Sequence, residues 1–331
     1  MQTAQTAAME FTATIRQLLM RGRGAAPLDA KATQRLWAAL LDGALDDAEL
    51  GAVIAAVAVA GETGDDLLGA YRAAQARLAT WSPSPAGGIV SIPAYGWFPG
   101  EAAIVALIAM LLRRVELRVV VHGVLDSPCG VSCARVLREL GVMPSASLAQ
   151  ADEDLAARSI AFLPVQLLSP AFARVLALRS RLGVETIAHR VAQVLDPAHG
   201  AAMRIVLNPE ALCGAAMQAM VESLDGDVLA LTWSGAQPPA TLALRPRIER
   251  FHASQLELLY EADAHEISAA LPLPDDALGA AAIVRAISSG VAPVPAPTLN
   301  LLAACLYATG RAPDLARAKA AAAVAGCRLA A

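Results

Sequence analysis

The strongest constraint on the fold is a β-branched run that passes through a polar turn into a short helix. Residues 119–142 read VVVHGVLDSPCGVSCARVLRELGV. The valines indicate a buried strand, and apolar residues at helical spacing after Ser132 predict a helix that ends at Gly141. A strand, a loop and a helix N-terminus in this order favour an anion, because free backbone N–H groups and the helix dipole both attract negative charge. The loop nevertheless contains Asp126 and no lysine or arginine, so it lacks the cation that a phosphate-binding catalyst needs.

Strand-like and helical segments alternate along most of the chain. The strand-like runs are residues 89–92, 117–121, 160–163 and 228–232. This alternation predicts an α/β fold, with a central sheet flanked by helices.

A separate helical domain precedes this sheet. Residues 11–77 carry apolar side chains at helical spacing, and Asp46 is placed to cap one of the helices. Residues 81–88 are rich in Pro, Ser and Gly, which favours a domain boundary. We therefore expect a small helical domain over residues 1–85 and an α/β domain over residues 86–331.

Composition excludes several classes of protein. The chain of 331 residues has 26 basic and 30 acidic residues, a net charge of −4, and no apolar run of the roughly 20 residues that cross a bilayer. Its N-terminus lacks the pattern of a secretory signal, so we expect a cytoplasmic protein without membrane contact. Five cysteines favour reduced thiols. Cys129 and Cys133 could share a helix face, but a structural zinc site needs four ligands, so we expect no metal and no cofactor.

The order of segments resembles the anthranilate phosphoribosyltransferase-like superfamily, glycosyltransferase family 3. The resemblance rests on LLDGALDDAELGAVIAAVAVAGETGDDLLGAYRA, on VHG before a helix ending in LRELGV, and on LALRSRLGVETIAHRVAQVLDPA and NLLAACLYATG. It implies a helical domain that is completed by helices inserted at about residues 169–196, and a homodimer formed through that domain.

The catalytic motifs of this superfamily are altered in this sequence. The resemblance implies three catalytic motifs: a GTGGD loop, a KHGN segment, and an Asp-Glu pair that holds magnesium for phosphoribosyl pyrophosphate. Here the first reads SIPAYGWFPGE, where Tyr95 and Trp97 fill a loop that needs a compact backbone. The second keeps only His122 and Gly123, and residues 228–248 contain no carboxylate.

A vestigial phosphate site is therefore expected at His122, Gly123 and Ser132. A catalytic role for His122 would need a partner carboxylate, and Asp126 is the only candidate nearby in the sequence. A buried histidine bonded to the backbone is the alternative interpretation.

These losses resemble the YbiB-type branch of the superfamily, which implies sequence-independent DNA binding without catalysis. Glu185 stands where a basic residue is common in that branch. Between residues 158 and 204 the sequence has six arginines and two acidic residues, a local charge of +4. We expect nucleic acid to contact an arginine-lined groove of a homodimer, formed by Arg21, Arg23, Lys31, Arg35, Arg179, Arg181 and Arg190.

Three alternatives remain open from the sequence. Any of these arginines could be a solvated residue paired with a nearby carboxylate. The protein could be a glycosyltransferase family 3 enzyme with a rearranged site, or it could bind small anionic metabolites before Ser132. The expected partner is DNA, with RNA as the alternative.

Overall fold

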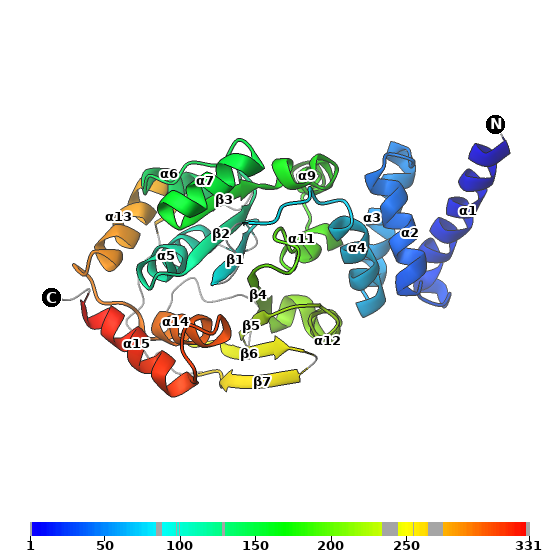
Figure 1. Ribbon diagram of the computed structural model, residues 1–331. Coiled ribbons are helices and arrows are strands. Elements are labelled where there is room, and N and C mark those ends of the chain that lie inside the picture. Colours follow the sequence, from blue (N-terminus) through cyan, green and yellow to red (C-terminus); the bar gives the residue numbers. More distant parts are fainter. Residues whose placement is uncertain are drawn as a thin grey trace. The chain divides into compact units, whose positions relative to one another are not determined.

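The computed structural model describes residues 2–83, 88–96, 98, 100–127, 130–233, 244–253, 255–263 and 274–328 (Figure 1). The chain divides into two compact units. Unit 1 comprises Met1–Leu78, Ser169–Leu195 and Ala215–Ser223, and unit 2 comprises Ala79–Leu168, Asp196–Gly214 and Leu224–Ala331.

Unit 1 is helical. Its elements are α1 (Gln2–Leu19), the 3-10 turn η1 (Arg21–Arg23), α2 (Ala30–Leu41), α3 (Asp47–Ala60), α4 (Gly64–Gln75), α9 (Pro170–Ala177), α10 (Arg179–Leu182), α11 (Ile187–Ala192) and the end of α12 (Glu210–Glu222). Asp46 caps α3, because its side chain accepts from the Glu49 N–H while the Glu49 carboxylate accepts from the Asp46 N–H.

Close helix packing explains the alanine and glycine content of this unit. Helix α2 packs on α4, and a Cβ at Gly69 would lie 2.5 Å from the carbonyl oxygen of Ala30. Only glycine allows this approach. The inserted helices pack on the N-terminal ones, α11 on α4 and α3, and α9 on α2.

Unit 2 is built on a seven-stranded sheet with the order β3-β2-β1-β4-β5-β6-β7. Strands β3, β2, β1, β4 and β5 are parallel, and β6 and β7 are antiparallel additions at one edge. The strands are β1 (Ile89–Ala94), β2 (Arg118–Gly123), β3 (Ile160–Pro164), β4 (Met203–Pro209), β5 (Val228–Trp233), β6 (Arg247–His252) and β7 (Gln255–Tyr260).

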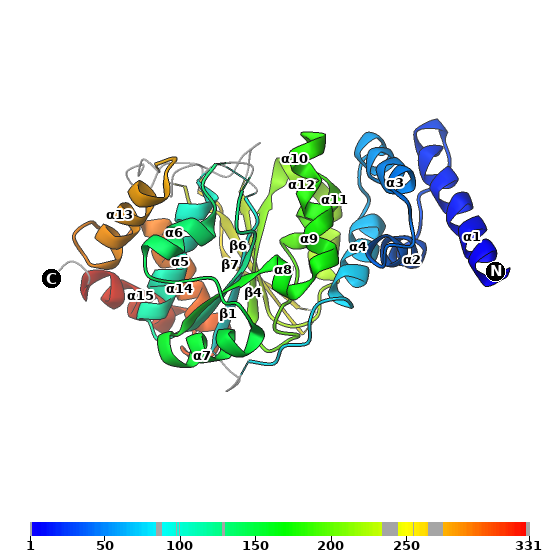
Figure 2. The ribbon, with the colours of Figure 1, turned by 90° about the horizontal axis from the view of Figure 1, so that it is seen from above.

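Helices cover this sheet and bury its central strands. They are α5 (Glu101–Arg114), α6 (Cys133–Glu139), α7 (Leu148–Arg158), α8 (Val165–Leu168), α13 (Ala277–Ser288), α14 (Ala296–Ala308) and α15 (Leu315–Arg328). Figure 2 shows α5, α6, α13, α14 and α15 on one side of the sheet. All six residues of β1 are buried, as expected for a central parallel strand covered on both faces.

The strand order places a topological switch between β1 and β4. The chain runs outward from β1 to β2 and β3, and it returns to the other side of β1 to form β4 and β5. In open α/β sheets, ligands bind at the carboxyl ends of the strands beside such a switch. The carboxyl end of β1, with the ends of its neighbours β4 and β2, is therefore the natural candidate site.

The predicted α/β fold is confirmed, and each of the four predicted strands is present to within two residues at either end. Strands β4, β6 and β7 were not predicted. Among the described residues, no helix has the length and apolar character needed to cross a membrane.

Candidate functional site

A buried pair, Tyr95 and His122, lies at the carboxyl ends of β1 and β2. The Tyr95 hydroxyl and His122 Nδ1 are 2.9 Å apart, and the two rings meet edge to face with centroids 5.5 Å apart. Burial, together with the charge of Arg204, lowers the pKa of His122 to about 3. A pKa this low keeps the ring neutral at physiological pH, and His122 is only 1 % exposed.

The hydrogen-bond partner of His122, which the sequence left open, is a side chain. Its partner is Tyr95, while Asp126 forms an exposed ion pair with Arg135 at 2.7 Å. Tyr95 itself is buried, and that burial and the nearby Glu101 raise the pKa of its hydroxyl. Trp97 lies outside the described residues. Tyr95 is 2 % exposed, which agrees with the expectation that its side chain fills the loop.

The loop that follows β1 is bound by a carboxylate of this chain, at the position where the resemblance implies a glycine-rich loop. Glu101 is the first residue of α5, is 2 % exposed, and accepts a hydrogen bond from the Gly96 N–H through Oε1 at 2.9 Å. Gly96 has φ +70°, and a Cβ there would collide with the Ser127 side chain. A negative group therefore already occupies the favourable position at the N-terminus of α5.

Gly123 and Ser132 have structural roles. A Cβ at Gly123 would collide with the carbonyl oxygen of Ala94 on the neighbouring strand. The Ser132 hydroxyl caps α6 by accepting from the Arg135 N–H, and it donates to the carbonyl oxygen of Leu125 at 2.5 Å. The helix that Ser132 caps has only seven residues. The Ser132 hydroxyl is therefore already engaged within the fold.

Side chains that bind metals do not form a large cluster among the described residues. Among them, no group of three or more His, Cys, Asp or Glu side chains could hold a metal ion. Cys133 is buried on α6, and its burial raises the pKa of the thiol well above the ordinary value. Cys129 lies outside the described residues.

Three of the arginines predicted to bind nucleic acid form buried or half-buried ion pairs inside unit 1. Arg21 meets Asp66 at 2.7 Å, and their side chains are 8 % and 1 % exposed. The other two pairs are Arg179 with Glu185 at 2.8 Å and Arg190 with Glu62 at 3.0 Å.

These three pairs belong to one cluster. Burial raises the pKa of Glu62, and the neighbouring carboxylates of Asp66 and Glu185 add to that rise against the charge of Arg190. Three arginines therefore balance three carboxylates, and the cluster stabilises the packing of α4 against the inserted helices. Glu185 has a direct effect here, because it neutralises an arginine that could otherwise face a phosphate.

Other basic residues of unit 1 do face solvent. Arg23, Lys31, Arg35 and Arg181 are exposed. Exposed basic side chains that form no ion pair with any described residue include Arg16, Arg23, Lys31, Arg72, Arg174 and Arg181. The sequence analysis did not predict Arg72 on α4 as a binding residue. A single arginine near acidic residues gives no indication in the sequence of whether it is exposed.

About half of the local charge of +4 counted between residues 158 and 204 is neutralised in the fold. Arg158 lies 3.9 Å from Asp154, and the buried Arg204 lies 4.0 Å from Asp196. Arg179 and Arg190 are paired as described. The unpaired charge of this segment is carried by Arg174 and Arg181.

The comparisons agree on the family. No protein-family model matches the chain. The chain is 30 % identical to YbiB of Escherichia coli strain K12 over 312 residues, which cover 92 % of this chain and 96 % of that protein. It is 31 % identical to anthranilate phosphoribosyltransferase of Methylocella silvestris over 176 residues, about half the length of each.

Solved structures show the same fold. Anthranilate phosphoribosyltransferase from Thermus thermophilus superposes with a TM-score of 0.72 at 20 % identity, covering 96 % of this chain and 95 % of that one. The enzyme from Saccharomyces cerevisiae, in complex with PRPP and Mg, gives 0.67 at 13 % identity, covering 96 % and 94 %. The chain belongs to the anthranilate phosphoribosyltransferase-like family and is homologous to YbiB over nearly its whole length.

Proposed function

We propose that the protein binds nucleic acid, with DNA as the preferred partner, without reading its sequence and without catalysing phosphoribosyl transfer. The observation that carries this proposal is the set of exposed basic side chains on unit 1 that form no ion pair with the described residues. Arg23, Lys31 and Arg181 are its predicted members. Charges that are not neutralised within the fold remain available to phosphate.

The residue types suit the phosphate backbone. Arginine presents a planar fork of donors that matches phosphate oxygens. Contacts of this kind position a duplex but carry no sequence information. Affinity then comes largely from the release of counterions, so binding falls as salt rises.

The distribution of charge matters more than the net charge of −4. Several acidic residues of unit 1 are tied to helix N-termini, where Asp29 caps α2 and Asp46 and Glu49 form the capping box of α3. These carboxylates offset the positive end of a helix dipole as well as nearby cations. In a homodimer, two such surfaces would contact one duplex, and this multivalency would raise the affinity of the protein for DNA.

The altered catalytic region supports the non-enzymatic part of the proposal. Glu101 supplies a carboxylate at the N-terminus of α5, and His122 is buried and neutral. A diphosphate held with magnesium usually needs one or two carboxylates as metal ligands, and residues 228–248 contain none.

Calorimetric titration of the full chain with two ligands separates this proposal from its rivals. A short DNA duplex should give a saturable heat, and phosphoribosyl pyrophosphate with Mg²⁺ should give none. Magnesium-dependent binding of phosphoribosyl pyrophosphate without DNA binding would favour an enzyme with a rearranged site. Magnesium-independent binding of pyrophosphate alone would favour a small-anion binder.

A further inference from the structure

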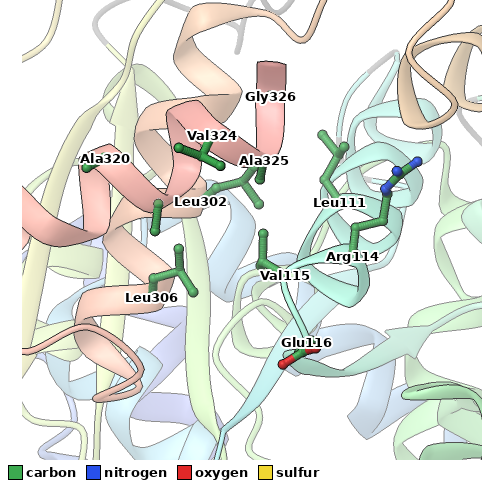
Figure 3. Close-up of a pocket in the computed structure, with 11 residues that line it drawn as sticks. Leu111, Arg114, Val115, Glu116, Leu302, Leu306, Ala320, Val324, Ala325 and Gly326 are labelled. Carbon is green, nitrogen blue, oxygen red and sulfur yellow. The ribbon is translucent and has the colours of Figure 1, made fainter. Parts of the chain in front are cut away.

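Helices α5, α14 and α15 of unit 2 line an open cleft that the proposed function does not use (Figure 3). The cleft has a volume of about 610 Å³. Its lining residues are mostly aliphatic: Leu111, Arg114, Val115, Glu116, Leu302, Leu306, Ala320, Ala321, Val324, Ala325 and Gly326.

Small residues on α15 explain why the cleft stays open. Helix α14 packs against both α5 and α15, and its Leu302 and Leu306 are buried at the floor. On the α15 side, the wall consists largely of Ala320, Ala321 and Ala325, whose methyl groups are too short to reach α5. Larger side chains at these positions would close the space.

The charged groups at the rim are engaged elsewhere. A guanidinium N–H of Arg114 donates to the carbonyl oxygen of Ser288. The carboxylate of Glu116 pairs with Arg311 at 3.2 Å. In Figure 3 the Arg114 guanidinium extends away from the aliphatic side chains, which face one another across the cleft.

We propose that this cleft binds an uncharged, apolar small molecule. The aliphatic walls give water few hydrogen-bond partners, so displacing water with an apolar ligand is favourable. The volume lies within the range of small-molecule sites, roughly 300–1,000 Å³. A charged ligand would lose hydration without gaining an ion partner in the aliphatic part of the cleft, because Arg114 extends away from it and Glu116 is paired with Arg311.

A neutral fluorescent probe, N-phenylnaphthylamine, tests the site in the intact protein. We expect a saturable rise in fluorescence with one probe per chain. Ala321→Phe places a ring in the cleft and should weaken probe binding by about tenfold or more. The matched control is Ala323→Phe, an exposed alanine of the same helix that does not line the cleft, and it should leave binding unchanged.

Displacement of the probe tests the class of ligand. Decanol should displace it, and decanoate, which has a similar chain and a negative charge, should be at least about tenfold weaker. Equal or better displacement by decanoate would overturn the assignment to uncharged ligands. The proposal as a whole fails if the unmodified protein shows no saturable binding, or if Ala321→Phe and Ala323→Phe have the same effect.

A second variant tests the cleft independently, in case Ala321→Phe does not fold. Val324→Trp fills the same cleft from an exposed position and should also reduce probe binding, while circular dichroism reports the fold of each variant. Normal probe binding by a folded Val324→Trp protein would likewise contradict the proposal.

Discussion

The carboxylate of Glu101 accepts a hydrogen bond from the backbone N–H of Gly96 at 2.9 Å, so the loop after β1 closes on the first residue of the next helix. In a phosphate cradle such backbone N–H groups point at the ligand. Here an internal anion takes that place, and Glu101 is 2 % exposed. The Gly96 N–H is thus bound by a side chain of the protein itself.

Replacing Glu101 tests this relationship. Glu101→Ala should lower the free energy of unfolding by about 1–2 kcal/mol, because the half-buried Gly96 N–H loses this acceptor. Inorganic phosphate should restore part of the loss by occupying the vacated position. Denaturant unfolding with and without phosphate measures both effects, and chloride at matched ionic strength is the control. Equal stabilisation of the unmodified protein by phosphate would count against the interpretation.

The buried histidines predict a loss of stability in acid. The folded-state pKa values are lowered to about 3 for His122 and about 4 for His189, both mainly by burial. The unfolded chain binds these protons below its ordinary histidine pKa of about 6.5, so stability should fall as pH drops below that value, by about 1.4 kcal/mol per pH unit for each histidine. Above pH 7 neither histidine makes the free energy of unfolding depend on pH.

Unfolding measured at several pH values between 7 and 5 checks this expectation. His122→Asn keeps a hydrogen-bonding group near the position of Nδ1 and should remove the share of the slope due to His122. A slope unchanged in this variant would show that His122 is not buried in its neutral form.

Arg21 and Arg23 are two residues apart, but we expect Arg21 to have a structural role and Arg23 a binding role. Substituting each in turn should distinguish the two roles. Arg21→Gln leaves Asp66 buried without its ion partner and should cost about 3 kcal/mol of unfolding free energy. Arg23→Gln alters an exposed side chain and should change stability by less than about 0.5 kcal/mol. Thermal and denaturant unfolding of both variants distinguish the two. Similar losses would mean that Arg23 also has a structural partner.

The exposed cations make a separate prediction for DNA binding. Changing Arg23 and Arg181 together to glutamine should weaken binding to every sequence alike and reduce the magnitude of the salt slope by about 2. Arg113→Gln is the matched control, since Arg113 is an exposed arginine of unit 2 that forms no ion pair with the described residues. Loss of affinity in the control equal to that in the double variant would place the contact surface elsewhere.

Local signals in the sequence predicted much of the fold. Short, strand-like apolar runs predicted β1, β2, β3 and β5, and Asp46 predicted the start of α3, because these features depend on near neighbours in the chain. Strands β6 and β7 were missed. In β6, RIERFH, the two apolar residues Ile248 and Phe251 are three apart, so the alternation that indicates a strand is absent. The strand gains its stability from pairing with β5, which depends on the fold.

The candidate site was less predictable for the same physical reason. Sequence alone cannot show that Arg21 is buried against Asp66 while Arg23 faces solvent, since the difference depends on how α4 packs beside η1. The role of Glu101 was also missed. An acidic residue at a helix start has an ordinary dipole explanation, and only the fold places its carboxylate beside the Gly96 N–H.

Fluorescence anisotropy of the full chain with two unrelated labelled DNA duplexes, measured across a salt series, is the most direct test of the proposed function. We predict similar affinities for both duplexes and a fall with salt whose logarithmic slope is about −0.9 for each phosphate contacted. Absence of binding at low salt, or a strong preference for one duplex, would contradict sequence-independent binding through the phosphate backbone.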